Sequence, residues 1–245
     1  MRFIHTADWH IGRAFRFLSD ATAPLLQAAR VDAVTTIGRL AREHGVRQVL
    51  IAGDLYHGDG LAERTLRQPL ERMHGCTALT WHVIPGNHDP ARPRGLWDRV
   101  RRLGLPPNVR LHAEAVVAGI EPGVSLLPAP GGSLAGDPTA WMDRAVTPDG
   151  DLRIGLAHGP SRTFGSGARP GAVIDPGRVR SAGLDYLALG DWHGQREEGT
   201  ACWYSGTPEP DRFDQPAAGH VLLVDVDRNA PARTTPLGAA GFRWA

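Results

Sequence analysis

Five short polar clusters lie along the chain, and each follows an apolar stretch that is typical of a β-strand. They supply carboxylate, imidazole and amide groups, the mixture of ligands that holds two divalent metal ions side by side. Metal-assisted hydrolysis of a phosphoester is therefore the first hypothesis for their chemistry. In chain order the clusters are Asp8-Trp9-His10, Gly53-Asp54, Gly86-Asn87-His88-Asp89, His158-Gly159 and Gly190-Asp191-Trp192-His193.

The elements that position the first three clusters follow from apolar spacing. Short apolar runs over residues 2–5, 48–52 and 79–84 predict strands, and each run leads into a cluster. Helical spacing predicts helices over residues 21–43 and 61–73, closed by Gly45 and Gly75. Alternating strands and helices indicate a largely parallel or mixed sheet, in which sites form beyond the carboxyl ends of the strands. The clusters can therefore converge in space.

The rest of the chain predicts a second sheet. We expect a helix over 96–103, strands near 109–117 and 124–127, and a helical turn around Trp141. A strand over 152–157 ends at His158, a helix covers 175–182, and a strand over 186–189 ends at Gly190. Residues from Gly219 onward predict edge strands that close this second sheet. The predicted fold class is α/β, a two-sheet β-sandwich flanked by helices, in a single domain over residues 1–245.

Each cluster offers a particular ligand chemistry. Asp8 and His10 alternate with Trp9, so at a strand end they point to the same side and can bind one metal ion. The two oxygens of a carboxylate can bridge two ions, which is the role expected of Asp54. His88 follows an amide ligand directly and is placed to protonate the leaving oxygen as a general acid. The other donors in this interpretation are Asn87, His158 and His193.

Composition narrows the class of protein. Basic and acidic side chains are balanced at 27 and 26, so net charge does not indicate a nucleic-acid binder. Every basic residue is Arg, which indicates a compositional bias rather than selection for phosphate binding. Cys76 and Cys202 fit no disulfide framework or zinc spacing. No signal-peptide pattern or membrane-span run is present, so the expectation is a cytoplasmic protein without membrane attachment.

The full set of clusters resembles the calcineurin-like metallophosphoesterases, whose motifs run D-x-H, G-D, G-N-H-[DE], H and G-H-x-H. Within that superfamily, the residues that flank the clusters are similar to those of SbcD-like DNA repair nucleases. The resemblance covers most of the chain, from residue 1 to about 226. The segments that carry it are residues 3–12, Gly53-Asp54-Leu55-Tyr56-His57, residues 186–190 and Tyr204-Ser205-Gly206-Thr207-Pro208-Glu209-Pro210.

The resemblance implies two divalent metal ions, with Mn as the first choice and Fe or Zn as alternatives. It implies that Asp54 is shared by both ions, and that His88 is the catalytic acid. His57 would be a second catalytic histidine that helps to position the DNA phosphate. The ligands implied for the first ion are Asp8, His10, Asp54 and His193, and those for the second are Asp54, Asn87, His158 and residue 191.

The last motif departs from the family pattern, because Asp191 stands where a histidine is expected. Two divalent ions carry +4, which Asp8 and Asp54 reduce to +2 and Asp191 reduces further to +1. A lower net charge makes a weaker Lewis acid and favours harder ions such as Mn or Fe(II). Our hypothesis is that Asp191 binds metal directly or through water.

The leading interpretation is a metal-dependent DNA exonuclease or endonuclease, with an SbcC-like ATPase as the partner that the resemblance implies. One alternative is a phosphodiesterase or phosphatase for nucleotides or other small phosphoesters. A second alternative is a binding or regulatory protein that has lost catalysis. Three further features stay open between two roles. Asp89 either assists His88 or caps its loop, the arginines between Arg92 and Arg110 either contact phosphates or form a solvated surface, and Trp192 either packs or stacks on a base.

Overall fold

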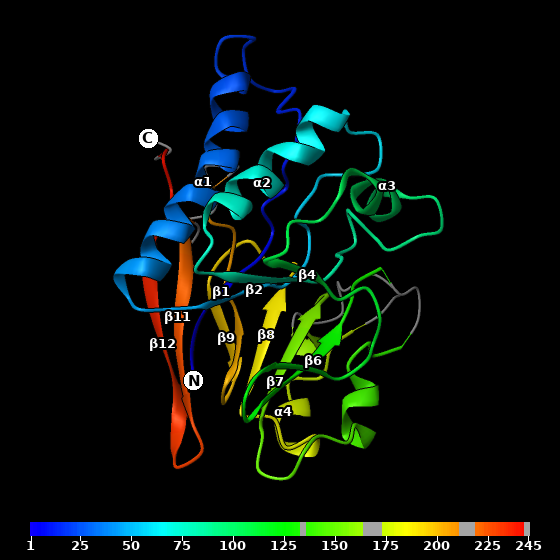
Figure 1. Cartoon of the computed structure of the whole chain (residues 1–245), viewed down its shortest axis with the longest axis vertical. Helices are drawn as coiled ribbons and strands as arrows, with labels where there is room; N and C mark the ends of the chain where they lie inside the picture. The colour runs from blue at the N-terminus through cyan, green and yellow to red at the C-terminus, as the bar shows by residue number, and fades with distance from the viewer. Residues whose placement is uncertain (133–135, 164–172, 211–218, 243–245) are drawn as a thin grey trace.

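The computed structural model describes residues 1–132, 136–163, 173–210 and 219–242 (Figure 1). Two sheets pack face to face. Helices α1, α2 and α3 cover the outer face of the first sheet, and η1 and α4 lie beyond the second. The elements are β1 (Arg2–Thr6), α1 (Ala23–Glu43), β2 (Gln48–Ile51), α2 (Glu63–Gly75), β3 (Thr80–Val83), α3 (Leu96–Leu103), β4 (Val109–Leu111), β5 (Ala118–Glu121), β6 (Val124–Ala129), η1 (Ala140–Arg144), β7 (Leu152–His158), α4 (Arg178–Ser181), β8 (Tyr186–Gly190), β9 (Arg196–Gly199), β10 (Cys202–Tyr204), β11 (His220–Asp227) and β12 (Ala230–Gly238).

The first sheet has the order β12-β11-β1-β2-β3-β4, and the second has the order β5-β6-β7-β8-β10-β9. Strands β1 to β4 are mutually parallel, and so are β6, β7, β8 and β10. The predicted α/β sandwich with flanking helices is confirmed. No helix among the described residues is both long and apolar enough to span a membrane.

Alternation along the central strands builds two cores at once. Phe3 and Leu50 point between the sheets and pack with side chains of β6, β7 and β8. Ile4, Val49 and Ile51 point to the other face and pack against α1 and α2. Because both faces of β1 and β2 are buried, these strands read as continuous apolar runs. That burial fixes where each strand ends, and so where each cluster begins.

The prediction for the C-terminal strands was wrong in one respect. Strand β11 does not close the second sheet, but pairs antiparallel with β1 inside the first sheet, and β12 forms the edge beside it. The apolar face of β11 contributes Leu222 and Val224 to the core between the sheets. Periodicity predicts such a strand but not its partner, which depends on contacts between residues more than 200 positions apart.

Two histidines outside the clusters form a structural pair. The rings of His82 and His112 are nearly parallel, with an interplanar angle of 18° and centroids 5.2 Å apart, and His82 Nδ1 lies 3.0 Å from His112 Nε2. His82 Nε2 also lies 3.0 Å from Gln48 Oε1. Burial, the neighbouring imidazole and Arg110 together lower the pKa of His82 to about 3, and burial and Arg110 lower the pKa of His112 to about 4. Both rings are therefore neutral in the folded protein.

This pair predicts acid destabilisation. Above pH 6.5 neither state protonates these rings, whereas below it the unfolded chain binds protons that the folded chain excludes. The contribution to stability is thus complete above pH 6.5 and is lost as the pH falls toward 3, by roughly 2 kcal/mol at pH 5 for His82. Urea unfolding of metal-free protein at pH 7 and pH 5 measures the loss. His82→Asn should unfold with a shallower pH dependence, and an unchanged dependence would contradict the assignment.

Candidate metal centre

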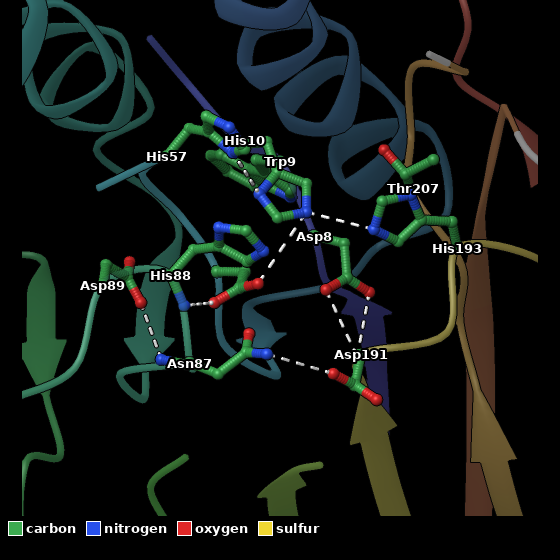
Figure 2. Close-up of polar contacts among 12 residues, drawn as sticks. Asp8, Trp9, His10, His57, Asn87, His88, Asp89, Asp191, His193 and Thr207 are labelled. Atoms are coloured by element: carbon green, nitrogen blue, oxygen red, sulfur yellow. Dashed lines mark hydrogen bonds and ion pairs between the residues drawn. The ribbon is translucent and has the colours of Figure 1, made fainter. Parts of the chain in front are cut away.

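The five clusters meet at one edge of the sandwich, which the βαβ pattern predicts for the first three of them. Asp8 and His10 follow β1, Asp54 follows β2, and Asn87 and His88 follow β3. From the second sheet, His158 ends β7, and Asp191 and His193 follow β8. Since these strands are parallel within each sheet, their carboxyl ends lie at the same edge, and the side chains that follow them point toward one another (Figure 2).

The backbone of the first cluster differs from the predicted strand end. Strand β1 stops at Thr6, and Asp8 and His10 have left-handed φ angles of 56° and 46°. Their backbone N–H groups donate to the carbonyls of Gly53 and Asp54, which ties the first cluster to the second. Trp9 faces away as expected, since its Nε1 donates to Thr6 Oγ1 and the ring is buried. Such conformations cost energy, and they gather at functional sites.

Glycines permit the close approach of the clusters. A Cβ atom at Gly53 would overlap the ring of His158, and one at Gly86 would overlap the carboxylate of Asp54. Gly53 also has a φ of 89°, a conformation that other residues rarely adopt. Both positions therefore need glycine for the ligand side chains to meet.

One group of donors combines side chains that follow β1 and β8 (Figure 2). Nitrogen and oxygen atoms of Asp8, His10 and His193 all lie within 4.8 Å of one another. His10 Nε2 is 3.1 Å from His193 Nε2 and 3.7 Å from Asp54 Oδ2. Burial, followed by the nearby His193 and Arg30, keeps the pKa of His10 well below its usual range. A neutral imidazole is the form that binds a metal ion.

A second group of donors surrounds His158. Its Nδ1 lies 2.8 Å from the carbonyl oxygen of Ala52, and because a carbonyl only accepts, Nδ1 carries the proton. Nε2, the nitrogen left to bind a metal ion, therefore lies 3.1 Å from Asn87 Oδ1, 3.6 Å from Asp54 Oδ1 and 3.9 Å from Asp191 Oδ1. Asp54 thus directs one oxygen to each group.

The donor chemistry fits two cations. Lone pairs converge in both groups, and Asp8, Asp54 and His158 are each no more than 2% exposed. Burial lowers the pKa of His158, but the carboxylates of Asp54, Asp8 and Asp191 outweigh it and raise that pKa to about 9. Without a metal ion, the carboxylates therefore favour the protonated, positively charged form of His158. Buried lone pairs of this kind are satisfied by a metal ion.

Asp191 lies inside the second group, although its side chain remains 25% exposed. Its backbone has a φ of 113°, and its N–H donates to both carboxylate oxygens of Asp8 at 3.2 and 3.1 Å. Asn87 Nδ2 donates to Asp191 Oδ1 at 3.4 Å, so the amide oxygen of Asn87 is left toward His158 (Figure 2). Burial raises the pKa of Asp191 above its ordinary value.

His57 and His88 stack beside the first donor group. Their ring centroids are 4.7 Å apart at an interplanar angle of 18°, and both rings contact His10. His88 is exposed, and its backbone N–H donates to Asp54 Oδ1 at 2.8 Å. The contacts of Asp89 favour the loop-capping role. It is fully buried and accepts from the backbone of Gly86 and Tyr56, so it caps the loop.

Arg99, Arg101 and Arg110 make side-chain contacts within the fold. Arg99 donates to the carbonyls of Asp59 and Leu61, and so holds the loop after His57 against α3. Arg101 pairs with Asp98, and Arg110 donates to the carbonyl of Pro107. Neither the phosphate-contact nor the solvated-surface interpretation predicts these contacts, which engage the three side chains within the protein.

Two supporting residues were missed by the sequence reasoning. Arg30, on α1, is 1% exposed and donates to the carbonyl of Trp9 at 2.6 Å. Trp9 lies between Asp8 and His10 in the chain. The backbone N–H of Thr207 donates to the carbonyl of His193 at 2.9 Å. The signal for Arg30 was a charged residue on the otherwise apolar face of a helix. Thr207 lies in the segment of residues 204–210 that was noted only as a resemblance.

Comparisons of the sequence with known proteins identify the family. A family model described as calcineurin-like phosphoesterase matches residues 1–195. The D subunit of nuclease SbcCD from Rhodobacter capsulatus is 27% identical over an alignment of 292 residues. The alignment covers 97% of this chain and 69% of the relative. The protein of the same name from Bacillus subtilis is 28% identical over 128 residues, covering 49% of this chain and 31% of the relative.

Solved structures support the fold. TT1561 of Thermus thermophilus superposes with a TM-score of 0.58 at 14% identity, covering 96% of this chain and 98% of that one. Purple acid phosphatase PPD1 from yellow lupin gives a TM-score of 0.50 at 12% identity, covering 91% and 49%. The family match spans well over half of the residues, and it includes all five clusters. The chain therefore belongs to the calcineurin-like phosphoesterase family of metal-dependent phosphoester hydrolases.

Proposed function

We propose that this protein is a single-domain, two-metal phosphodiesterase that cleaves DNA, as an exonuclease or endonuclease in DNA repair. The observation that carries the proposal is the pair of donor groups that share Asp54, whose Oδ2 lies 3.7 Å from His10 Nε2 and whose Oδ1 lies 3.6 Å from His158 Nε2. The similarity to relatives named as part of the nuclease SbcCD supports the substrate.

The ligands follow from the two groups. Asp8, His10, Asp54 and His193 would hold one ion, and Asp54, Asn87, His158 and Asp191 the other. When bound, the two ions would activate water and neutralise charge that develops on the phosphoryl oxygens. Mn is our first choice, with Fe and Zn as alternatives, because oxygen donors and the extra charge of Asp191 favour harder ions.

His88 would act as the general acid. Its exposed ring lies beside His10 and is open to a substrate, and a bond from its backbone to Asp54 fixes the loop that carries it. A positioned imidazole in such a place can donate a proton to the leaving oxygen. His57 stacks on His88 and would help to place the phosphate.

Asp191 provides a direct test of the second ligand set. Asp191→Ala should lower metal occupancy at one of the two positions, with a loss of affinity of about 10- to 100-fold, because the site loses a charged donor. Asp191→His should restore occupancy and shift the preference toward Zn, since imidazole suits that ion. Metal analysis after dialysis measures both effects. Equal occupancy in the wild type and Asp191→Ala would sink the hypothesis.

The substrate is tested by comparing phosphodiesters of different size. With Mn supplied, labelled DNA should be cleaved with a higher kcat/KM than bis-p-nitrophenyl phosphate. Hydrolysis of the small ester and of nucleotides, without cleavage of DNA, would instead support the small-phosphoester alternative. Full metal loading with no turnover on any phosphoester would support a regulatory protein.

Trp192 adds a test within the same assay. Its side chain is 45% exposed, and it lies between two proposed metal ligands, where an unpaired base can stack. Stacking of a base on an aromatic ring contributes about 1–3 kcal/mol. Trp192→Ala should therefore reduce kcat/KM on single-stranded DNA about tenfold more than on bis-p-nitrophenyl phosphate, and Trp192→Phe should restore most of the difference. Equal losses on both substrates would contradict a stacking role.

A partner is also part of the proposal. The curated relatives are named as the D subunit of a nuclease, SbcCD, so an SbcC-like ATPase is the partner we propose. Co-purification with such an ATPase from the same genome tests it, and a failure of the two chains to associate would remove this part of the proposal.

A further inference from the structure

Three imidazoles gather on the solvent side of the first donor group. Nitrogen atoms of His10, His57 and His88 all lie within 4.8 Å of one another. His10 uses a different ring nitrogen for each neighbour. Its Nδ1 lies 3.2 Å from His57 Nδ1, whereas its Nε2 points to His193 (Figure 2). His10 therefore stands between two sets of donors.

The spacing suits a small tetrahedral ion. With zinc–nitrogen bonds of 2.0–2.1 Å, two imidazole nitrogens on one tetrahedral ion are about 3.3 Å apart. The two Nδ1 atoms of His10 and His57 lie 3.2 Å apart. His10 is buried, but its Nδ1 faces the half-buried His57 beside the exposed His88, so an ion would approach from the side of these two rings. Three imidazoles without a carboxylate suit zinc better than manganese.

The neutral ring of His10 cannot bind metal through Nδ1 and Nε2 at the same time. A neutral imidazole has one nitrogen with a free lone pair, and the other carries the proton. If Nε2 binds metal with Asp8 and His193, then Nδ1 donates its proton to His57 Nδ1. If a metal ion binds Nδ1 instead, the proton moves to Nε2, from which it faces Asp54 Oδ2 at 3.7 Å. The first donor group then loses a ligand.

We propose that His10 Nδ1, His57 and His88 form a third metal site, selective for zinc-like ions, whose occupation withdraws His10 from the Asp8–His193 group. Binding at this site depends only on the three rings. That it inhibits hydrolysis rests on the proposed function. Excess zinc would thus inhibit by releasing one catalytic ion and by tying up His57 and His88.

The test is a zinc titration of the manganese-loaded protein. Free Mn released is followed by electron paramagnetic resonance, and hydrolysis of bis-p-nitrophenyl phosphate is measured in parallel. In the wild type, zinc should release one equivalent of Mn and inhibit over the same range. His57→Gln should require at least tenfold more zinc for both effects. Its Mn affinity should stay within about threefold of the wild type, because the Gln oxygen can still accept from His10 Nδ1.

Two further variants complete the design. His88→Gln should shift the zinc dependence in the same direction, and it also settles the question if His57→Gln fails to bind Mn. His74→Gln, which removes an exposed imidazole on α2, should leave the zinc dependence unchanged. Equal zinc dependence in the wild type, His57→Gln and His88→Gln would overturn the third site, since zinc would then simply replace Mn at Nε2. If no variant hydrolyses any phosphodiester, the proposed function fails, but the zinc-induced release of Mn still decides the third site.

Discussion

Replacing Asp54 with Asn is expected to reduce phosphodiester hydrolysis by about a thousandfold or more and to lower the occupancy of both metal positions. The two oxygens of Asp54 point to different donor groups, toward His10 Nε2 and His158 Nε2. An amide keeps the size of the side chain but removes the charge that draws two cations together, and electrostatic stabilisation at such a centre is worth several kcal/mol. Metal analysis and initial rates with saturating Mn measure both effects.

Asp149→Asn is the matched control, because it makes the same change at an exposed carboxylate outside both donor groups. Its occupancy and rate should equal those of the wild type. Far-ultraviolet circular dichroism checks that Asp54→Asn remains folded. If Asp54→Asn loses one ion and keeps the other at full affinity, Asp54 is not shared between the two groups.

His88→Gln is expected to separate substrates by their leaving groups. Cleavage of DNA should fall about 10²- to 10³-fold, because the departing alkoxide needs a proton from a positioned acid. Hydrolysis of bis-p-nitrophenyl phosphate should fall less than tenfold, since nitrophenolate leaves without protonation. The variant keeps the backbone N–H that donates to Asp54, so Mn occupancy should be retained. Parallel kinetics on the two substrates give the result.

An equal loss on both substrates, at unchanged Mn occupancy, would show that His88 does not act as the acid. A loss of Mn would instead place its ring among the ligands. His112→Gln serves as a control, because that imidazole belongs to the structural pair with His82 and lies outside both donor groups.

Much of this architecture could be predicted from local sequence patterns. Apolar runs at β1, β2 and β3 are buried on both faces, so they stand out from the polar clusters that follow them. The rule that sites form at the carboxyl ends of parallel strands then brings Asp8, Asp54 and Asn87 together. The helix over α1 was equally visible, because its buried residues recur at helical spacing along its whole length.

Other features depend on contacts between distant residues, which periodicity does not encode. The position of β11 beside β1 is set by pairing between strands more than 200 residues apart in the chain. The left-handed turns at Asp8 and His10 are held by the carbonyls of Gly53 and Asp54 rather than by local propensity. The bond between His10 and His57 arises from the same long-range packing.

The most direct test of the central claim is a titration of chelator-treated protein with Mn, in which bound Mn and the rate of phosphodiester hydrolysis are recorded on the same samples. Two donor groups that share Asp54 predict that two equivalents bind and that most of the activity appears with the second. Full activity at one equivalent, or activity that does not depend on bound Mn, would contradict a two-metal centre at the end of these strands.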